Sequence, residues 1–122
     1  MHSESLRAYC LAKPGTTEEL PFDAVTLVYK VMGKMYALHG LERLPAAVNL
    51  KCNPERAEEL RASYAGIQPG YHMSKKHWNT IRLEEDVEDD LIRELIDHSY
   101  DLVVSKLRKA DREALRALGG DR

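Results

Sequence analysis

The sequence predicts an α+β fold in which an antiparallel sheet packs against an N-terminal helix and a long C-terminal helix. Residues 25–32 and 35–39 are rich in β-branched and aromatic side chains, which is typical of a hairpin. Residues 47–52 alternate between apolar and polar, as a strand with one buried face does. Apolar residues recur at helical spacing between 91 and 107 and predict a helix long enough to cover the sheet. A chain of 122 residues fits a single domain, expected to span residues 1–122.

The first expected element is a short amphipathic helix. Ser3 is a suitable N-cap, and apolar side chains follow it at helical spacing. These are Leu6, Tyr9 and Cys10. A Lys-Pro-Gly sequence at 13–15 then ends the helix, because proline and glycine do not continue it.

A turn and a second helix follow from the residues around the predicted strands. The Gly-Lys pair at 33–34 is the expected turn of the hairpin. After the alternating strand, Asn53 is a good N-cap, and Pro54 suits the first helical position, where its missing N–H needs no partner. Helix-forming residues continue over 55–62, so we expect a helix there.

Residues 77–83 are the expected last strand, because Gly66, Pro69 and Gly70 break the chain before it. Alternation divides the side chains of this strand between the two faces of the sheet. The two sets are Asn79, Ile81 and Leu83 on one side, and Trp78, Thr80 and Arg82 on the other.

Charges of opposite sign flank the long C-terminal helix. Acidic residues at 84–90 precede it and basic residues at 106–109 follow it, which complements the helix dipole. Asp111 is the expected cap of a short final helix. The ordered chain is expected to end at the two glycines 119–120, with the last few residues disordered.

Composition restricts the possible functions. The net charge of −2 and the pI near 6.2 provide no global cationic field, so any contact with nucleic acid must be local. No apolar run approaches the roughly 20 residues that cross a bilayer, and the N-terminus lacks a leader pattern, so we expect a cytoplasmic protein without membrane contact. Cys10 and Cys52 lie outside any zinc-site spacing and are expected to be buried and reduced.

Patterns that carry catalysis are missing from the sequence. It contains no G-x-S-x-G elbow and no glycine-rich phosphate loop, so we expect a protein that is not an enzyme and has no cofactor. The acidic run at 84–90 lacks the ligand spacing and central glycine of a calcium loop, and the helix dipole explains it. The five histidines show no metal-site spacing, so no metal is expected.

The sheet face opposite the apolar one combines cations with a large aromatic residue. Thr26, Asn49 and Thr80 would share this face with lysines, an arginine and Trp78, while a basic turn precedes Trp78. Lysine and arginine bind phosphates, and an indole ring can stack on bases. The candidate DNA-binding residues are Lys30, Lys51, Lys75, Lys76, His77, Trp78, Asn79 and Arg82. Two alternatives stay open: a solvated face whose lysines prevent edge aggregation, and a core position for Trp78.

The sequence resembles the MmcQ/YjbR family in four separate blocks that occur in the same order. They are PFDAVTLVYKVMGKMYAL at 21–38, VNLKCNPE at 48–55, PGYHMSKKHWNTIRL at 69–83 and LIDHSYDLVVSKL at 95–107. The resemblance implies a compact α+β domain similar to the frataxin-like fold and to a double-wing DNA-binding motif, in which hairpin wings flank a curved sheet. It implies DNA binding and brings no catalytic residues.

Two positions depart from the family pattern. Asp23 stands where glycine is common, and Ser74-Lys75 stands where Asn-Arg is common. Lysine lacks the bidentate fork of arginine, so we expect Lys75 to contact the DNA backbone and not to read bases.

Three functions remain as hypotheses. The first is weak, salt-dependent DNA binding, with lysines and Arg82 on phosphates, Trp78 stacked and Asn79 or Asn49 donating hydrogen bonds. The second is a protein-interaction or chaperone-like module that uses the same face, with Trp78 and Tyr71 as anchors. The least supported is a metal or redox role for His72 and His77, by analogy with frataxin-like iron binding.

Overall fold

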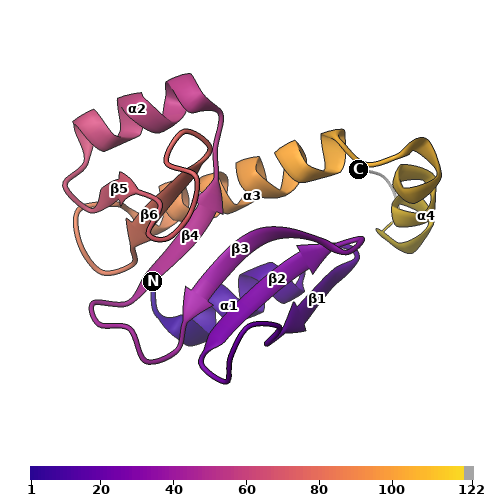
Figure 1. Ribbon diagram of the computed structural model, residues 1–122, viewed down its shortest axis with the longest axis horizontal. Helices are drawn as coiled ribbons and strands as arrows, with labels where there is room; N and C mark the ends of the chain where they lie inside the picture. Colours follow the sequence, from indigo (N-terminus) through magenta and orange to yellow (C-terminus); the bar gives the residue numbers. More distant parts are fainter. Residues whose placement is uncertain (120–122) are drawn as a thin grey trace.

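The computed structural model describes residues 1–119, which form a six-stranded sheet and four helices (Figure 1). The strands are β1 (Thr16–Glu19), β2 (Thr26–Val31), β3 (Lys34–Gly40), β4 (Ala47–Lys51), β5 (Ile67–Pro69) and β6 (Trp78–Arg82). They lie in the order β1-β2-β3-β4-β6-β5, and each neighbouring pair is antiparallel. The helices are α1 (Ser3–Leu11), α2 (Pro54–Ser63), α3 (Asp89–Ser105) and α4 (Lys109–Gly119). The predicted α+β class is therefore confirmed.

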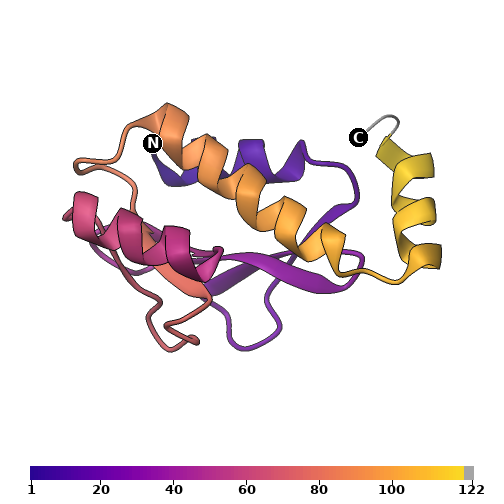
Figure 2. The same cartoon turned by 90° about the horizontal axis from the view of Figure 1, so that it is seen from above.

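The two faces of the sheet differ in what covers them. Helices α1 and α3 lie on one side, called the inner face, and loops project on the opposite side, called the outer face (Figure 2). Leu6 and Cys10 of α1 and Ile92 and Ile96 of α3 are buried in the inner core. As the apolar stripe between residues 91 and 107 predicts, the long helix packs across the sheet.

A buried serine connects α3 to two strands. Ser99 lies in the middle of the apolar stripe of α3 and is fully buried. Its hydroxyl donates to the carbonyl oxygen of Tyr36 on β3 and accepts from the backbone N–H of Lys51 on β4 at 2.9 Å. Both polar functions of Ser99 are thus satisfied, and its burial costs little.

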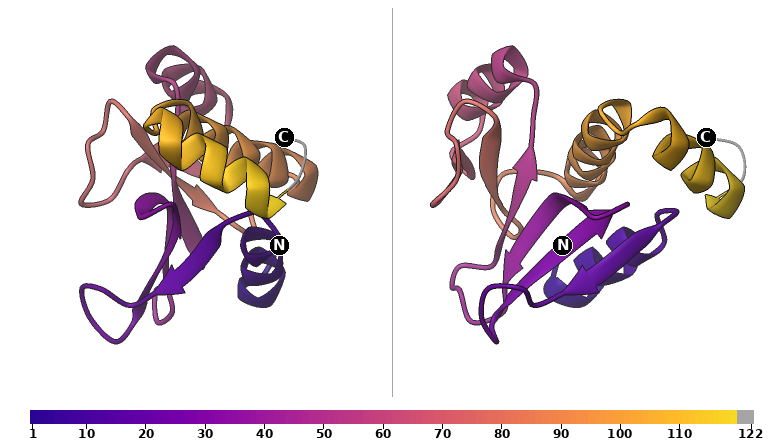
Figure 3. Two further views of the ribbon diagram at one scale, coloured as in Figure 1. Left: turned by 90° about the vertical axis from the view of Figure 1, so that its right-hand side faces the viewer. Right: turned by 45° about the vertical axis from the view of Figure 1, so that its right-hand side comes forward.

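Helix α4 follows the C-terminal end of α3 and lies beyond it, at one end of the molecule (Figure 3). Its one buried side chain among the described residues is Leu115, which reaches the turn between α1 and β1. Gly15 in that turn has a φ of 72°, and a Cβ there would lie 2.5 Å from Leu115 Cδ1. Glycine is therefore required at position 15 for both backbone conformation and helix docking.

Several expectations from the sequence need correction at the level of single residues. His2 caps α1 in place of Ser3, because its Nδ1 accepts from the Ser5 N–H. Met32 and Gly33, both with positive φ, form the hairpin turn in place of 33–34. Asp111 lies inside the first turn of α4 and is not its cap. The expectation for the last few residues falls on 120–122, outside the described residues.

Other expectations are confirmed. Asn53 Oδ1 accepts from the N–H groups of Glu55 and Arg56 and so caps α2, with Pro54 at its first position. Cys10 and Cys52 are both buried and form no disulfide. Within residues 1–119, no helix has the length and apolarity needed to cross a membrane.

Candidate functional site

Strand register places the predicted side chains on the outer face. On β4 and β6, Asn49 pairs with Thr80 and Lys51 pairs with Trp78, so these four residues point to the same side. Leu38 of β3 lies opposite Asn49 and extends this face toward β2. The predicted alternation along β6 is therefore confirmed.

Trp78 is covered, although it belongs to the outer face. Only 8% of it is exposed, and it packs with Val28 and Leu38 and against the partly buried Met35 and Met73. Met73 comes from the loop at 70–77, which folds back over the sheet. The expectation that Trp78 offers an open ring for stacking is wrong, and the alternative of a packed anchor is correct.

Asn79 is directed to the inner face and is 1% exposed. Its side chain donates to the carbonyl oxygen of Ala57 at 3.4 Å and accepts from Arg61 Nη1 at 3.3 Å. These bonds connect β6 to α2. The predicted contact of Asn79 with DNA is wrong, because alternation places residue 79 with Ile81 in the core.

Two of the predicted phosphate ligands already form ion pairs with carboxylates. Lys30 Nζ lies 3.3 Å from Glu19 Oε1, and Arg82 Nη1 lies 2.9 Å from Glu85 Oε1. Glu19 belongs to β1, a strand that the sequence analysis missed. The charges of Lys30 and Arg82 are thus neutralised locally.

The remaining predicted cations gather at one end of the sheet, here called the basic corner. It consists of the predicted residues Lys51, Lys75, Lys76 and His77, together with Arg61 of α2, which was not predicted. Arg61 of α2 donates to the carbonyl oxygen of Lys75 at 2.8 Å, and the Cys52 N–H donates to the carbonyl oxygen of His77 at 2.8 Å. These bonds hold the turn beside the end of β4. Sequence reasoning missed Arg61, because its position on α2 carries no local signal.

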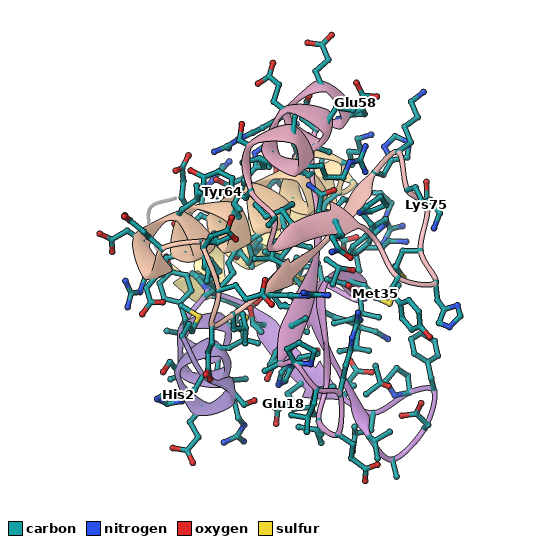
Figure 4. The ribbon with its side chains drawn as sticks, turned by 90° about the vertical axis from the view of Figure 1, so that its left-hand side faces the viewer. His2, Glu18, Met35, Glu58, Tyr64 and Lys75 are labelled. Atoms are coloured by element: carbon teal, nitrogen blue, oxygen red, sulfur yellow. The ribbon has the colours of Figure 1, made fainter. Side chains whose placement is uncertain are left out.

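The three lysines of the basic corner form no ion pair within residues 1–119. Lys75 stands on the projecting loop, and Glu58 stands on the neighbouring helix α2 (Figure 4). Glu55, Glu58 and Pro54 border the same shallow depression as Lys75 and Lys76. The positive charge is therefore local and faces two carboxylates across that depression.

A groove of 720 Å³, here called the outer groove, lies on the outer face. Thr26, Leu38 and Asn49 contribute to it from β2, β3 and β4. Phe22 and Tyr71, from two different loops, also line it, and they are 65% and 56% exposed. Sequence reasoning missed this groove and Phe22, because loops that meet across a sheet leave no pattern in the sequence.

Hydrogen bonds and ring contacts hold Tyr71 at the groove. Its backbone N–H donates to Thr80 Oγ1 at 2.9 Å, and this hydroxyl donates to Asn49 Oδ1 at 2.6 Å. The Arg43 guanidinium lies 4.6 Å from the centroid of the Tyr71 ring, and the His72 ring lies 4.0 Å from it. His72 has a φ of 57°, a left-handed conformation that non-glycine residues rarely adopt.

The two histidines of the metal hypothesis lie in the loop at 70–77. Among residues 1–119, no three His, Cys, Asp or Glu side chains are placed to hold a metal ion together.

Comparison with known proteins connects this chain to one family. Residues 11–102 match the YjbR family model. The protein YjbR of Escherichia coli K12 is 35% identical over 116 residues, which cover 94% of this chain and 98% of the relative. YbdF of Escherichia coli O157:H7 is 38% identical over 79% of each chain. The names of these relatives state neither a ligand nor an activity.

Solved structures agree with the fold. A crystal structure of a Deinococcus radiodurans protein with the domain DUF419 is 44% identical and superimposes with a TM-score of 0.85, covering 92% of this chain and 86% of the other. A crystal structure from Pseudomonas syringae is 28% identical with a TM-score of 0.73, covering 84% and 98%.

Proposed function

The chain belongs to the YjbR family, and from that premise we propose that it is a non-catalytic DNA-binding protein that uses the outer face of its sheet. One observation carries the proposal: the loop at 70–77 joins lysines that form no ion pair within the described residues to exposed aromatic side chains. Lys75 and Lys76 stand at one end of this loop and Tyr71 at the other. Phosphate-binding cations beside stackable rings are the combination with which proteins bind nucleic acid strands.

The electrostatics favour weak binding with few phosphate contacts. The chain has a net charge of −2, and Lys30 and Arg82 are ion-paired, so the basic corner supplies the attraction. About three phosphate contacts correspond to a slope of roughly −2 when the logarithm of the affinity is plotted against that of the salt concentration. The affinity for DNA should therefore fall about a hundredfold when the salt concentration rises tenfold.

The test is fluorescence anisotropy of end-labelled DNA at a series of salt concentrations. Replacement of both Lys75 and Lys76 by Gln should weaken binding about tenfold and reduce the magnitude of the salt slope by about 1.4. The matched control replaces Lys106 and Lys109 by Gln, where α3 ends and α4 begins, and should change affinity less than twofold. Equal effects of the two double variants, or wild-type binding without salt dependence, would contradict the proposal.

A second candidate is the binding of a polypeptide at the same face, and a separate observation favours it. The three loops that contribute residues to the outer groove also carry exposed large apolar side chains, which are common at protein interfaces. These are Leu20, Phe22, Leu41, Leu44 and Tyr71. Selection of peptides from a display library tests this function: apolar peptides should bind the wild type and the lysine variant alike, and Phe22→Ser should abolish their binding. Failure to enrich any peptide sensitive to Phe22→Ser would exclude it.

A further inference from the structure

The outer groove combines an apolar floor with rings at its border. Its volume of 720 Å³ falls in the range of about 300–1,000 Å³ that is usual for sites of small molecules. Leu38 and Met35 supply apolar floor, while Phe22 and Tyr71 expose more than half of their surface. A flat, mainly apolar ring is the ligand class that such a lining accommodates.

A fixed hydrogen-bond donor is present in this apolar lining. The Thr80 hydroxyl accepts from the Tyr71 N–H, so its own hydrogen is directed to Asn49 Oδ1. This orients the Asn49 amide with its carbonyl toward Thr80, and its Nδ2 has no hydrogen-bond partner among the described residues. Asn49 therefore presents a donor to the groove whose direction is set before any ligand binds.

The donor discriminates between ligand classes. An aliphatic or phenyl side chain of a peptide would cover Asn49 Nδ2 without offering an acceptor, which costs about 1–3 kcal/mol for a buried donor. Every nucleobase carries an acceptor on its edge. The lining thus favours a nucleobase over an apolar peptide side chain.

Positive charge reaches the groove from two sides. Arg43 lines it, lies over the Tyr71 ring and forms no ion pair within residues 1–119. On the other side of the 70–77 loop lies the basic corner with Lys75 and Lys76. A strand with a base in the groove can therefore extend its phosphates along the loop toward these lysines. In a duplex, by contrast, both faces of each base are stacked and cannot enter.

We propose that the outer groove holds one unpaired nucleobase against Phe22 and Tyr71, with Asn49 Nδ2 donating to its edge, so that the preferred ligand is single-stranded nucleic acid. This inference rests on the proposed function and names its ligand class. Because one donor meets an acceptor on every base, the preference among bases is expected to be only a few fold.

The experiment compares three labelled ligands of equal length. They are single-stranded oligothymidine, the same oligothymidine in a duplex with its complement, and a fully abasic strand that keeps only the sugar-phosphate backbone. The affinity of the wild-type protein for single-stranded oligothymidine should exceed its affinity for either of the other two ligands by a factor of about ten. Tyr71→Ala should remove this ratio, and Tyr71→Phe, which keeps the ring, should retain it. Asn49→Asp is isosteric and lacks the donor, and it should also lower the ratio.

The ratio separates this inference from the proposed function. Lys75→Gln with Lys76→Gln should weaken binding of all three strands and leave the ratio unchanged. Equal, salt-dependent binding of oligothymidine and the abasic strand would overturn the base site and leave DNA binding intact, whereas no binding of any strand would overturn both.

A measurement on the wild type avoids any dependence on folded variants. Titration with thymidine, followed by NMR, should shift the side-chain amide of Asn49 and the ring signals of Phe22 and Tyr71. Shifts caused by an apolar peptide and not by thymidine would overturn the inference in favour of a polypeptide ligand.

Discussion

Thr80 on β6 donates a hydrogen bond of 2.6 Å to Asn49 on β4, directly across the strand pair. The same hydroxyl accepts from the Tyr71 N–H, so one buried group holds both a strand and the loop that borders the outer groove. Thr80 therefore fixes the Tyr71 end of this loop, while Arg61 and the Cys52 N–H hold its other end.

Replacement of Thr80 by Val should lower the free energy of unfolding by about 1–2 kcal/mol, because two polar groups lose a buried partner while the side-chain shape is kept. Urea denaturation measures the change. Thr26→Val is the matched control, since the Thr26 hydroxyl donates to the exposed Asp23 at 3.2 Å and should contribute less than about 1 kcal/mol. Equal losses in the two variants would argue against a special role for Thr80.

Trp78 should behave as a buried side chain in spectroscopy and in stability. Its indole packs with Val28 and Leu38, so acrylamide should quench its fluorescence far less in the native protein than in urea. Trp78→Ala should cost about 3–5 kcal/mol of unfolding free energy. Native quenching as strong as that of the unfolded chain would contradict the packed position.

The two thiols should be inert in the native protein. Burial raises the pKa of Cys10 to about 12 and also raises the pKa of Cys52, so almost no thiolate exists near neutral pH. A chromogenic disulfide reagent should therefore label neither thiol in native protein and both in urea. Rapid labelling of the native protein would show that at least one of the two thiols is accessible to the reagent.

His98 should make stability depend on pH. Burial lowers the pKa of His98 below its ordinary value of 6.5; Arg56 lowers it further, while Asp101 and Glu94 oppose the shift. The neutral ring accepts from the Asn53 N–H at 3.1 Å, at the start of α2. Because the folded state prefers the neutral form, this stabilisation is complete above the ordinary pKa and is lost as the pH falls through the lowered one.

Urea unfolding between about pH 7.5 and about pH 5 tests this dependence. The wild type should lose more stability over this range than His98→Gln, which cannot be protonated. If the variant loses as much as the wild type, His98 is not the group responsible.

The sequence was sufficient for elements that have their own local signals. Asn53 and Pro54 mark the start of α2, and alternation assigns Trp78 and Asn79 to opposite faces of the sheet. That alternation also contained the reason to exclude Asn79 from the binding residues, because it places residue 79 beside Ile81. Strand β1 escaped detection because its sequence, TTEE, contains no apolar residue.

The candidate site was less accessible from the sequence, because it depends on contacts between distant segments. Alternation predicts which face of the sheet Trp78 occupies. It cannot predict that Met73, on the 70–77 loop, packs against Trp78. The neutralisation of Lys30 depends on Glu19 and therefore on the undetected β1. Phe22 and Tyr71 are 49 positions apart and border one groove only after the loops have folded.

The two unlike faces of the sheet have an evolutionary consequence. The inner face, with α1 and α3, contains most of the buried core, whereas exposed side chains such as Phe22 and Tyr71 border the groove on the other side. Mutations at these exposed positions cost little stability, so they can accumulate while the scaffold persists. Structures that keep this fold at 28% identity can therefore have diverged in what they bind without any change of architecture.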